Sequence, residues 1–250
     1  MSGRLLTALR SDTVHQAFST VSVPDQTLMV ESVLKLHRHG FSAGKILKLE
    51  GDTAPATYCV LDGWLALSKS TEDGQRQIID FVLPGDIVNP ASADKRTSAV
   101  QIEALCYAKV SVVPTGDWAS LLEEVPILEA RESQIIASAL SRMSERILRL
   151  GKGTAEMRVA YSLIELYLRL QAISKVCNDS FHIPLNQQQL GEFAGLSSVH
   201  VCRTTRRLSR KNILTAQGQM DITIHDLQGL AEVAGVDLEA LKTEIIPAGR

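Results

Sequence analysis

Five basic residues and no acidic residue occupy the segment from Arg203 to Lys211. Guanidinium and ammonium groups bind phosphate oxygens, and a guanidinium can also donate two hydrogen bonds to one guanine base. The arginines recur at spacings of three or four, which places them along one side of a helix. The pattern predicts a helix that contacts a polyanion; a solvated cationic helix that binds nothing is the alternative. The basic residues are Arg203, Arg206, Arg207, Arg210 and Lys211.

The segment around these residues, 185–214, has the pattern of two short helices joined by a tight turn. Gly195 permits the left-handed conformation that ends the first helix. Asn186 is an N-cap for the first helix, and either Ser197 or Ser198 caps the second. Because such a unit presents the start of its second helix to base edges in the major groove, the sequence predicts a helix-turn-helix that reads DNA.

Two further patterns predict β-structure, one before the predicted helices and one after the two-helix unit. Residues 33–114 are short β-type runs separated by glycine and aspartate, and Asp73-Gly74 is a hairpin signal. These runs predict an antiparallel β-roll. After the two-helix unit, residues 213–224 predict a small β-hairpin wing around Gln217-Gly218.

Between the β-runs and the two-helix unit, residues 127–150 change to a helical pattern. Apolar residues there recur at alternating steps of four and three, which is the seam spacing of a two-stranded coiled coil. We expect this helix to pair with its equivalent in a second copy; packing against the β-roll of its own subunit is the alternative. The seam consists of Ile136, Leu140, Met143, Ile147 and Leu150, and it is expected to be flanked by Arg142, Glu145, Arg146 and Arg149.

Composition limits the class of protein. The 250 residues carry a net charge of −2, so any affinity for nucleic acid must come from a local patch. The chain has no apolar run of membrane-spanning length and no signal-peptide h-region, so we expect a cytoplasmic protein with no membrane partner. The four cysteines are scattered, which disfavours a zinc ribbon or a disulfide framework and predicts reduced thiols. They are Cys59, Cys106, Cys177 and Cys202.

A β-roll, a long helix, a glycine-rich break and a winged helix-turn-helix, in this order, resemble the Crp/Fnr family of bacterial transcription regulators. The resemblance covers nearly the whole chain. It is carried by EGD (50–52), LDGW (61–64), EDGQRQIIDFVLPGDIV (72–88), LGKGTAEMRVAYSLIELYLRL (150–170) and PLNQQQLGEFAGLSSVHVCRTTRRL (184–208).

The resemblance implies an α+β fold and a homodimer that binds an inverted repeat in double-stranded DNA and contacts RNA polymerase. It implies no enzymatic activity. The expected divisions are an N-terminal helical segment (1–28), a β-roll similar to cyclic-nucleotide-binding domains (29–116), a dimerisation helix (117–150), a hinge (151–153), a winged helix-turn-helix domain (154–235) and a C-terminal tail (236–250).

Roles for individual residues also follow from the resemblance. Arg203 stands where the family's arginine reads a guanine, with a phosphate contact as the alternative. Many members carry a glutamate where this chain has Val199, so the family's best-known half-site is not expected; valine offers only apolar contact, for instance to a thymine methyl. The groove-facing residues are Ser198, Val199, Cys202 and Arg203, and the expected phosphate anchors are Ser197, Arg206, Arg207, Arg210 and Lys211.

The family's cyclic-nucleotide pocket has Gly-Glu after a Gly-Asp turn, and an arginine immediately before Ser-Ala. Residues 85–100 lack the Gly-Glu pair, and Arg96 precedes Thr97 instead of Ser98. A buried cyclic phosphate would therefore be poorly paired, which argues against cyclic AMP. We expect Lys95 and Arg96 to be surface charges on a hairpin.

Other possible signals depend on protein ligands that the sequence must supply. An iron-sulfur cluster requires clustered cysteines, and none precedes Cys59. No cofactor is predicted and the effector stays open; a haem ligand is also left open among His15, His37, His39 and His182, although lone histidines usually have structural roles.

Cys202 is a possible redox switch within the predicted reading helix. Its cationic neighbours favour the thiolate, and oxidation would add bulk or negative charge where phosphate must dock. The alternative is a small side chain that fits the groove.

Two rival functions belong to other classes. A cupin-like metal enzyme would use His37, His39 and Glu50, but Glu50 follows His39 by eleven residues, too far for the usual cupin spacing. The chain shows no Ser-His-Asp grouping, P-loop or dinucleotide turn. The other rival is a β-roll that binds a protein partner and carries a vestigial DNA domain.

Overall fold

The computed structural model describes residues 24–53, 55–218 and 220–248, which form two compact units. Of the described residues, the first unit comprises those from Pro24 to Lys69 together with Phe81–Ile135; the second comprises Ser70–Asp80 and those from Ile136 to Ala248. Most of the predicted N-terminal segment, including His15, lies outside the described residues. None of the helices in the described part has the length and apolar character that crossing a membrane requires.

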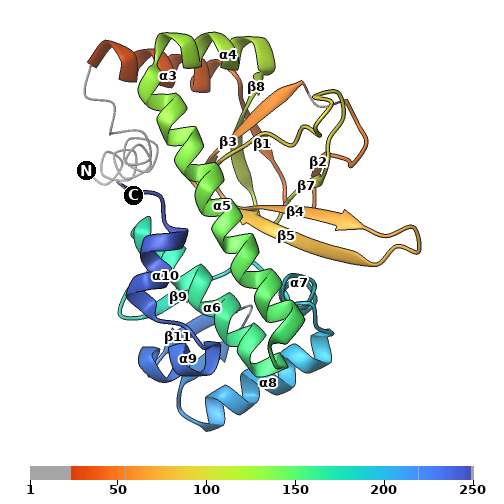
Figure 1. The fold of residues 1–250 in the computed structure, drawn as a ribbon, viewed down its shortest axis with the longest axis vertical. Coiled ribbons are helices and arrows are strands. Elements are labelled where there is room, and N and C mark those ends of the chain that lie inside the picture. The colour runs from red at the N-terminus through yellow and green to blue at the C-terminus, as the bar shows by residue number, and fades with distance from the viewer. Residues whose placement is uncertain (1–23, 54, 219, 249–250) are drawn as a thin grey trace, which may run out of the picture. The chain divides into compact units, whose positions relative to one another are not determined.

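The first unit is built around the predicted antiparallel β-roll (Figure 1). One sheet has the strand order β1-β8-β3-β6 and the other β2-β7-β4-β5, and apolar side chains from both sheets form one core cluster. The α+β class is confirmed. The strands are β1 (Arg38–Phe41), β2 (Ile46–Lys48), β3 (Ala56–Asp62), β4 (Leu65–Ser70), β5 (Arg76–Val82), β6 (Ile87–Val88), β7 (Gln101–Ala104) and β8 (Ala108–Pro114). The end of β4 at Ser70 and the first residues of β5, up to Asp80, belong to the second unit.

Three helices pack on the roll and close a second core cluster. They are α3 (Pro24–Leu36), α4 (Thr115–Glu124) and the first turns of α5 (Pro126–Lys152). The segment predicted as one helix over 117–150 is thus two helices. Proline lacks the N–H that would continue α4 but is well suited to the first position of a helix, so Pro126 starts α5.

The part of α5 in the second unit has two different faces. Seam residues Ile136, Leu140 and Ile147 are exposed, at 60%, 61% and 67% of their surface, while Met143 and Leu150 are half-buried. The arginines expected beside this seam, Arg142, Arg146 and Arg149, are buried instead, so that expectation was wrong. They lie on another face of the helix, where carboxylates and carbonyls of the same unit bind them.

Asp80, at the end of the hairpin segment 70–80, is the centre of this buried charge network. Its carboxylate accepts hydrogen bonds from Arg142 Nη2 at 2.8 Å, Arg146 Nη1 at 3.2 Å and Arg169 Nη1 at 3.1 Å. Burial by itself raises the pKa of Asp80, but the three guanidiniums outweigh burial and hold that pKa well below its usual range. Glu165, also buried, contributes a second carboxylate to the same arginines.

The remainder of the second unit contains the predicted winged helix-turn-helix. β10 and β11 pair from Leu214↔Ile224 to Gln217↔Asp221, which confirms the wing, and β9 adds a third strand that was not predicted. The segment 236–250, predicted only as a tail, contains a helix. The elements are α6 (Ala155–Ala172), β9 (Ser180–His182), α7 (Gln187–Ala194), α8 (Ser198–Arg210), β10 (Leu214–Gln217), β11 (Asp221–Ile224), α9 (Leu227–Ala234) and α10 (Leu238–Ile245).

Candidate nucleic-acid interface

Helix α7 is held at its start by a reciprocal cap. Asn186 Oδ1 accepts from the backbone N–H of Gln189 at 2.8 Å, and Gln189 Oε1 accepts from the backbone N–H of Asn186 at 2.9 Å. Both interactions satisfy backbone donors that have no partner within the helix. The predicted cap at Asn186 is confirmed, and it fixes where α7 begins.

The turn between α7 and α8 depends on two glycines. Gly195 ends α7 in the left-handed region with φ of 64°, as predicted. A Cβ on Gly195 would lie 2.5 Å from Leu150 Cδ2, and a Cβ on Gly191 would collide with the carbonyl oxygen of Leu196. Because no larger side chain fits either position without displacement, Gly191 sets how closely the turn before α8 approaches α7, and Gly195 sets how closely this turn approaches Leu150 of α5.

Helix α8 begins at Ser198, and Ser197 is its N-cap. The Ser197 hydroxyl accepts from the backbone N–H of His200 and lies 2.8 Å from His200 Nδ1. Ser197, predicted as a phosphate anchor, therefore already uses its hydroxyl to cap the helix. His200 was not singled out from the sequence.

The two faces of α8 separate the apolar from the cationic side chains. Val201, Thr204 and Leu208 are buried and fix the helix to its unit. The opposite face is exposed, including Val199 at 54%, whereas Cys202 is half-buried. The structure thus places the predicted reading residues Ser198, Val199 and Arg203 and the predicted anchors Arg206, Arg207 and Arg210 at the exposed surface of one helix, α8.

Glu156, in the first turn of α6, binds two of the predicted phosphate anchors. Its carboxylate lies 2.6 Å from Lys211 Nζ and 3.5 Å from Arg207 Nη1. The hydrogen bond from Lys211 is the main reason that the pKa of Glu156 lies below its ordinary value. No spacing in the sequence could indicate this contact, because Glu156 and Lys211 are 55 residues apart.

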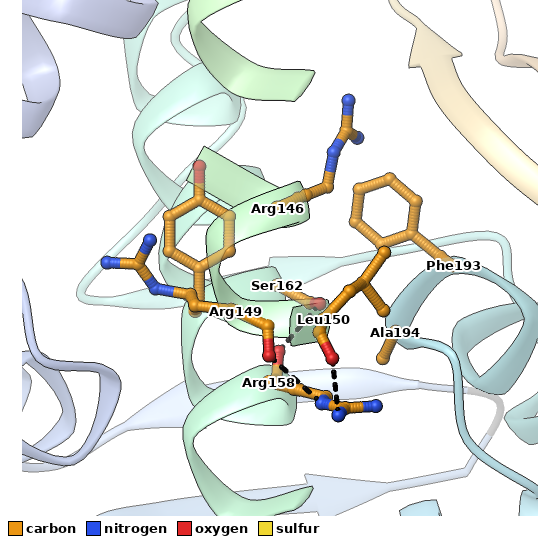
Figure 2. A pocket seen from close by; sticks show the side chains of 8 residues that line it. Arg146, Arg149, Leu150, Arg158, Ser162, Phe193 and Ala194 are labelled. Carbon is orange, nitrogen blue, oxygen red and sulfur yellow. Dashed lines mark hydrogen bonds between the residues drawn. The ribbon is translucent and has the colours of Figure 1, made fainter. Parts of the chain in front are cut away.

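Arg158 ties the predicted hinge to the helix-turn-helix. It donates from Nη2 to the carbonyl of Leu150 at 2.7 Å and from Nε to the carbonyl of Arg149 at 3.1 Å (Figure 2). It also donates to the carbonyls of Gly153 and Gly195. These bonds satisfy carbonyls at the end of α5, so the junction between α5 and α6 is held by a side chain that the sequence analysis overlooked.

Residues 85–100 do not fit a cyclic nucleotide. Asp86, the carboxylate after Gly85, is buried and accepts from the backbone N–H of Leu83 at 2.8 Å, so it closes a turn. Lys95 and Arg96 are exposed at the tip of a hairpin whose flanks meet at the Ala91–Ser98 bridge, as expected. The segment offers no buried guanidinium for a cyclic phosphate.

The side chains of the cupin-like alternative have separate partners. His37 Nε2 lies 3.2 Å from Asp117 Oδ2, and Glu50 pairs with Lys69 at 2.8 Å. Among the residues that the structure describes, no three His, Cys, Asp or Glu side chains are grouped so that they could hold one metal ion.

Comparison with known proteins identifies both parts of the chain. Residues 157–233 match the family model of the Crp-like helix-turn-helix domain, and residues 38–125 match that of the cyclic nucleotide-binding domain. The match to the second family covers the roll and α4.

Similar proteins extend the match over most of the chain. The nitrogen fixation regulation protein FixK of Bradyrhizobium diazoefficiens is 32% identical over 171 residues, which are 68% of this chain and 70% of FixK. The transcriptional activator protein FnrA of Stutzerimonas stutzeri is 29% identical over 197 residues, 79% of this chain and 80% of FnrA.

A solved structure shares the fold. The structure of FixK2 from Bradyrhizobium japonicum has a TM-score of 0.72 and 24% identity, and the match covers 80% of this chain and 98% of FixK2. Neither the cupin-like enzyme nor the interaction module finds support among these relatives. With a capped helix-turn-helix, a β-roll and these matches, the chain belongs to the Crp/Fnr family of DNA-binding transcription regulators.

Proposed function

We propose that the protein acts as a homodimer that places one α8 helix per subunit in successive major grooves of an inverted repeat. Half-sites are then centred about one helical turn, ~34–36 Å, apart. The observation that carries this proposal is the division of α8 into a buried apolar face and an exposed face with arginines and small side chains. RNA polymerase is the further partner, and the proposed activity is binding without a chemical step.

Within the interface, contacts divide into readout and positioning. Ser198, Val199, Cys202 and Arg203 stand at the start of α8 and are proposed to meet base edges. Arg203 is the residue with a fork of donors for O6 and N7 of one guanine, a contact worth about 1–3 kcal/mol of discrimination. The proposed phosphate anchors are Ser197, Arg206, Arg207, Arg210 and Lys211, which give a salt-sensitive affinity.

The dimer is proposed to form through α5. Three apolar side chains of the seam, Ile136, Leu140 and Ile147, are more than half exposed in the single chain. Burying them between two copies removes apolar surface from water at positions that repeat along one helix face. Leu150 also packs close to Gly195, so it supports the helix-turn-helix as well as the seam.

Control of the regulator is proposed to act on the arrangement of its DNA domains, with 151–153 as the hinge. Because Arg158 binds the carbonyls of Leu150 and Gly153, a rotation there must break these hydrogen bonds or carry them along. The mismatch of residues 85–100 with a cyclic phosphate supports an effector other than cyclic AMP.

Selection of bound duplexes from a randomised pool tests the proposal, using the reduced protein without added ligand and sequencing what it retains. We expect a two-fold symmetric site, and we expect Arg203→Ala to lose preference at one position of each half-site while keeping salt-sensitive binding. If the wild-type protein recovers no symmetric site under any ligand, or if Arg203→Ala recovers the same site with the same preference, the proposed readout is wrong.

A further inference from the structure

Glu156 is an acidic residue of α6 that contacts the cationic C-terminal end of the proposed reading helix, α8. It lies in the first turn of α6, and its side chain is 19% exposed. It binds Arg207 and Lys211, which lie one helical turn apart at the C-terminal end of α8. Their side chains remain 64% and 49% exposed. The hydrogen bond from Lys211 is the largest cause of the lowered pKa of Glu156, and this carboxylate is ionised at neutral pH, as an ordinary glutamate also is.

We propose that Glu156 limits the affinity for DNA by partly neutralising Arg207 and Lys211, the phosphate-binding residues at the C-terminal end of α8. This inference rests on the proposed function. The two cations and the carboxylate together carry a charge of +1, so this end of the helix releases fewer counterions on binding DNA than its basic residues suggest. Arg206 and Arg210 have no ion pair within the described part of the chain, and they keep their full charge.

The contact opposes phosphate binding even though it leaves donors free. An ammonium has three donors and a guanidinium five, so both groups can contact Glu156 and a phosphate together. A phosphate bound there, however, comes close to the carboxylate, and two like charges repel each other. Glu156 is therefore a positioning residue that tunes binding strength without touching a base, and its effect must be equal on all DNA sequences.

Titration of DNA binding over a series of salt concentrations measures the effect of Glu156 on the affinity for DNA and on its salt dependence. Glu156→Gln is expected to tighten binding by about three- to tenfold at ~0.1 M salt and to make the slope of log K against log salt steeper by about one. The same fold-change is expected on the selected site and on an unrelated duplex, so the ratio between them stays constant. Glu156→Ala should act in the same direction, because the lost charge is the cause.

A matched control separates the contact from the general field of the protein. Glu239→Gln removes the same charge from the first turn of another helix, α10, where Glu239 is exposed, and we expect less than about a twofold change. In a Lys211→Gln, Arg207→Gln background, Glu156→Gln should have no further effect. Circular dichroism verifies that each variant keeps its helices.

The inference fails if folded Glu156→Gln binds DNA equally or more weakly with an unchanged slope, which would make Glu156 neutral or a support for the two cations. It also fails if the tightening persists without Arg207 and Lys211. Failure of the proposed function is distinguishable, since the wild-type protein would then show no difference between the selected and the unrelated duplex.

Discussion

At the scale of single residues, the exposed cations of α8 follow the sequence prediction, whereas the burial of the α5 arginines and the carboxylate partners of both sets were not predicted. The arginines of α8 are exposed as expected, whereas Arg142 and Arg146 of α5 are buried around Asp80. Both sets have helical spacing and identical chemistry. The two sets differ in the carboxylates that other segments bring to them. Asp80 and Glu165 bind the buried arginines of α5, whereas Glu156 binds only part of the cationic set of α8.

Cys202 gives a prediction at this scale. Its thiol is half-buried beside the exposed Arg203, so an oxidant can reach it, and an oxidised sulfur would place negative charge near phosphate. Peroxide is expected to weaken DNA binding of the wild-type protein by about tenfold and that of Cys202→Ser much less. Cys177→Ser, which removes an exposed thiol outside α8, should stay as sensitive as the wild type. Equal weakening in Cys202→Ser and wild type would exclude the switch.

At the scale of elements, the glycine at the end of α7 does more than permit a turn. Gly195 and Gly235 both end helices in the left-handed conformation, with φ of 64° and 65°. A Cβ at Gly235 would lie in ordinary contact, 3.5 Å from Met157 Cε, whereas at Gly195 it would overlap with Leu150. Replacing either glycine by alanine would therefore strain the backbone at positive φ, but only at Gly195 would the new Cβ also clash with a neighbouring side chain.

We therefore expect Gly235→Ala to lower the free energy of unfolding by about 1 kcal/mol, and Gly195→Ala to lower it by about 2–4 kcal/mol. Gly195→Ala should also weaken DNA binding, because relief of the overlap moves the start of α8. Urea denaturation and DNA titration check both variants. Equal losses of stability in the two variants would show that Leu150 does not constrain the turn.

At the scale of the whole molecule, the exposed seam of α5 predicts the assembly. Leu140→Glu is expected to produce monomers in sedimentation experiments and to weaken binding to a two-half-site duplex by about a hundredfold, because a charge would be buried between the helices. Leu148→Glu is the matched control. Leu148 is exposed to a similar degree, 55% against 61%, but lies off the seam, so this variant should stay dimeric. A dimeric Leu140→Glu would place the interface elsewhere.

Local sequence by itself determined the helix-turn-helix, its Asn186 cap, the left-handed Gly195, the wing and the β-roll. These features depend on contacts or backbone conformations within a few residues, or on periodicity along one element. The break of α4 from α5 at Pro126 belongs to the same class of signal, and the longer apolar pattern hid it.

Only the tertiary structure decided which charged residues meet. The ionic and hydrogen-bonded contacts of the second unit join segments that are separated by up to 89 residues: Glu156 with Lys211, Arg158 with the end of α5, and Asp80 with three arginines. The sequence alone does not distinguish an arginine that makes such a contact from one that does not. Their energy depends on burial and on atom positions, which no spacing rule encodes. The sequence therefore determined the class of partner, DNA, and the tertiary structure decided how much of the charge of each basic side chain remains for binding phosphate.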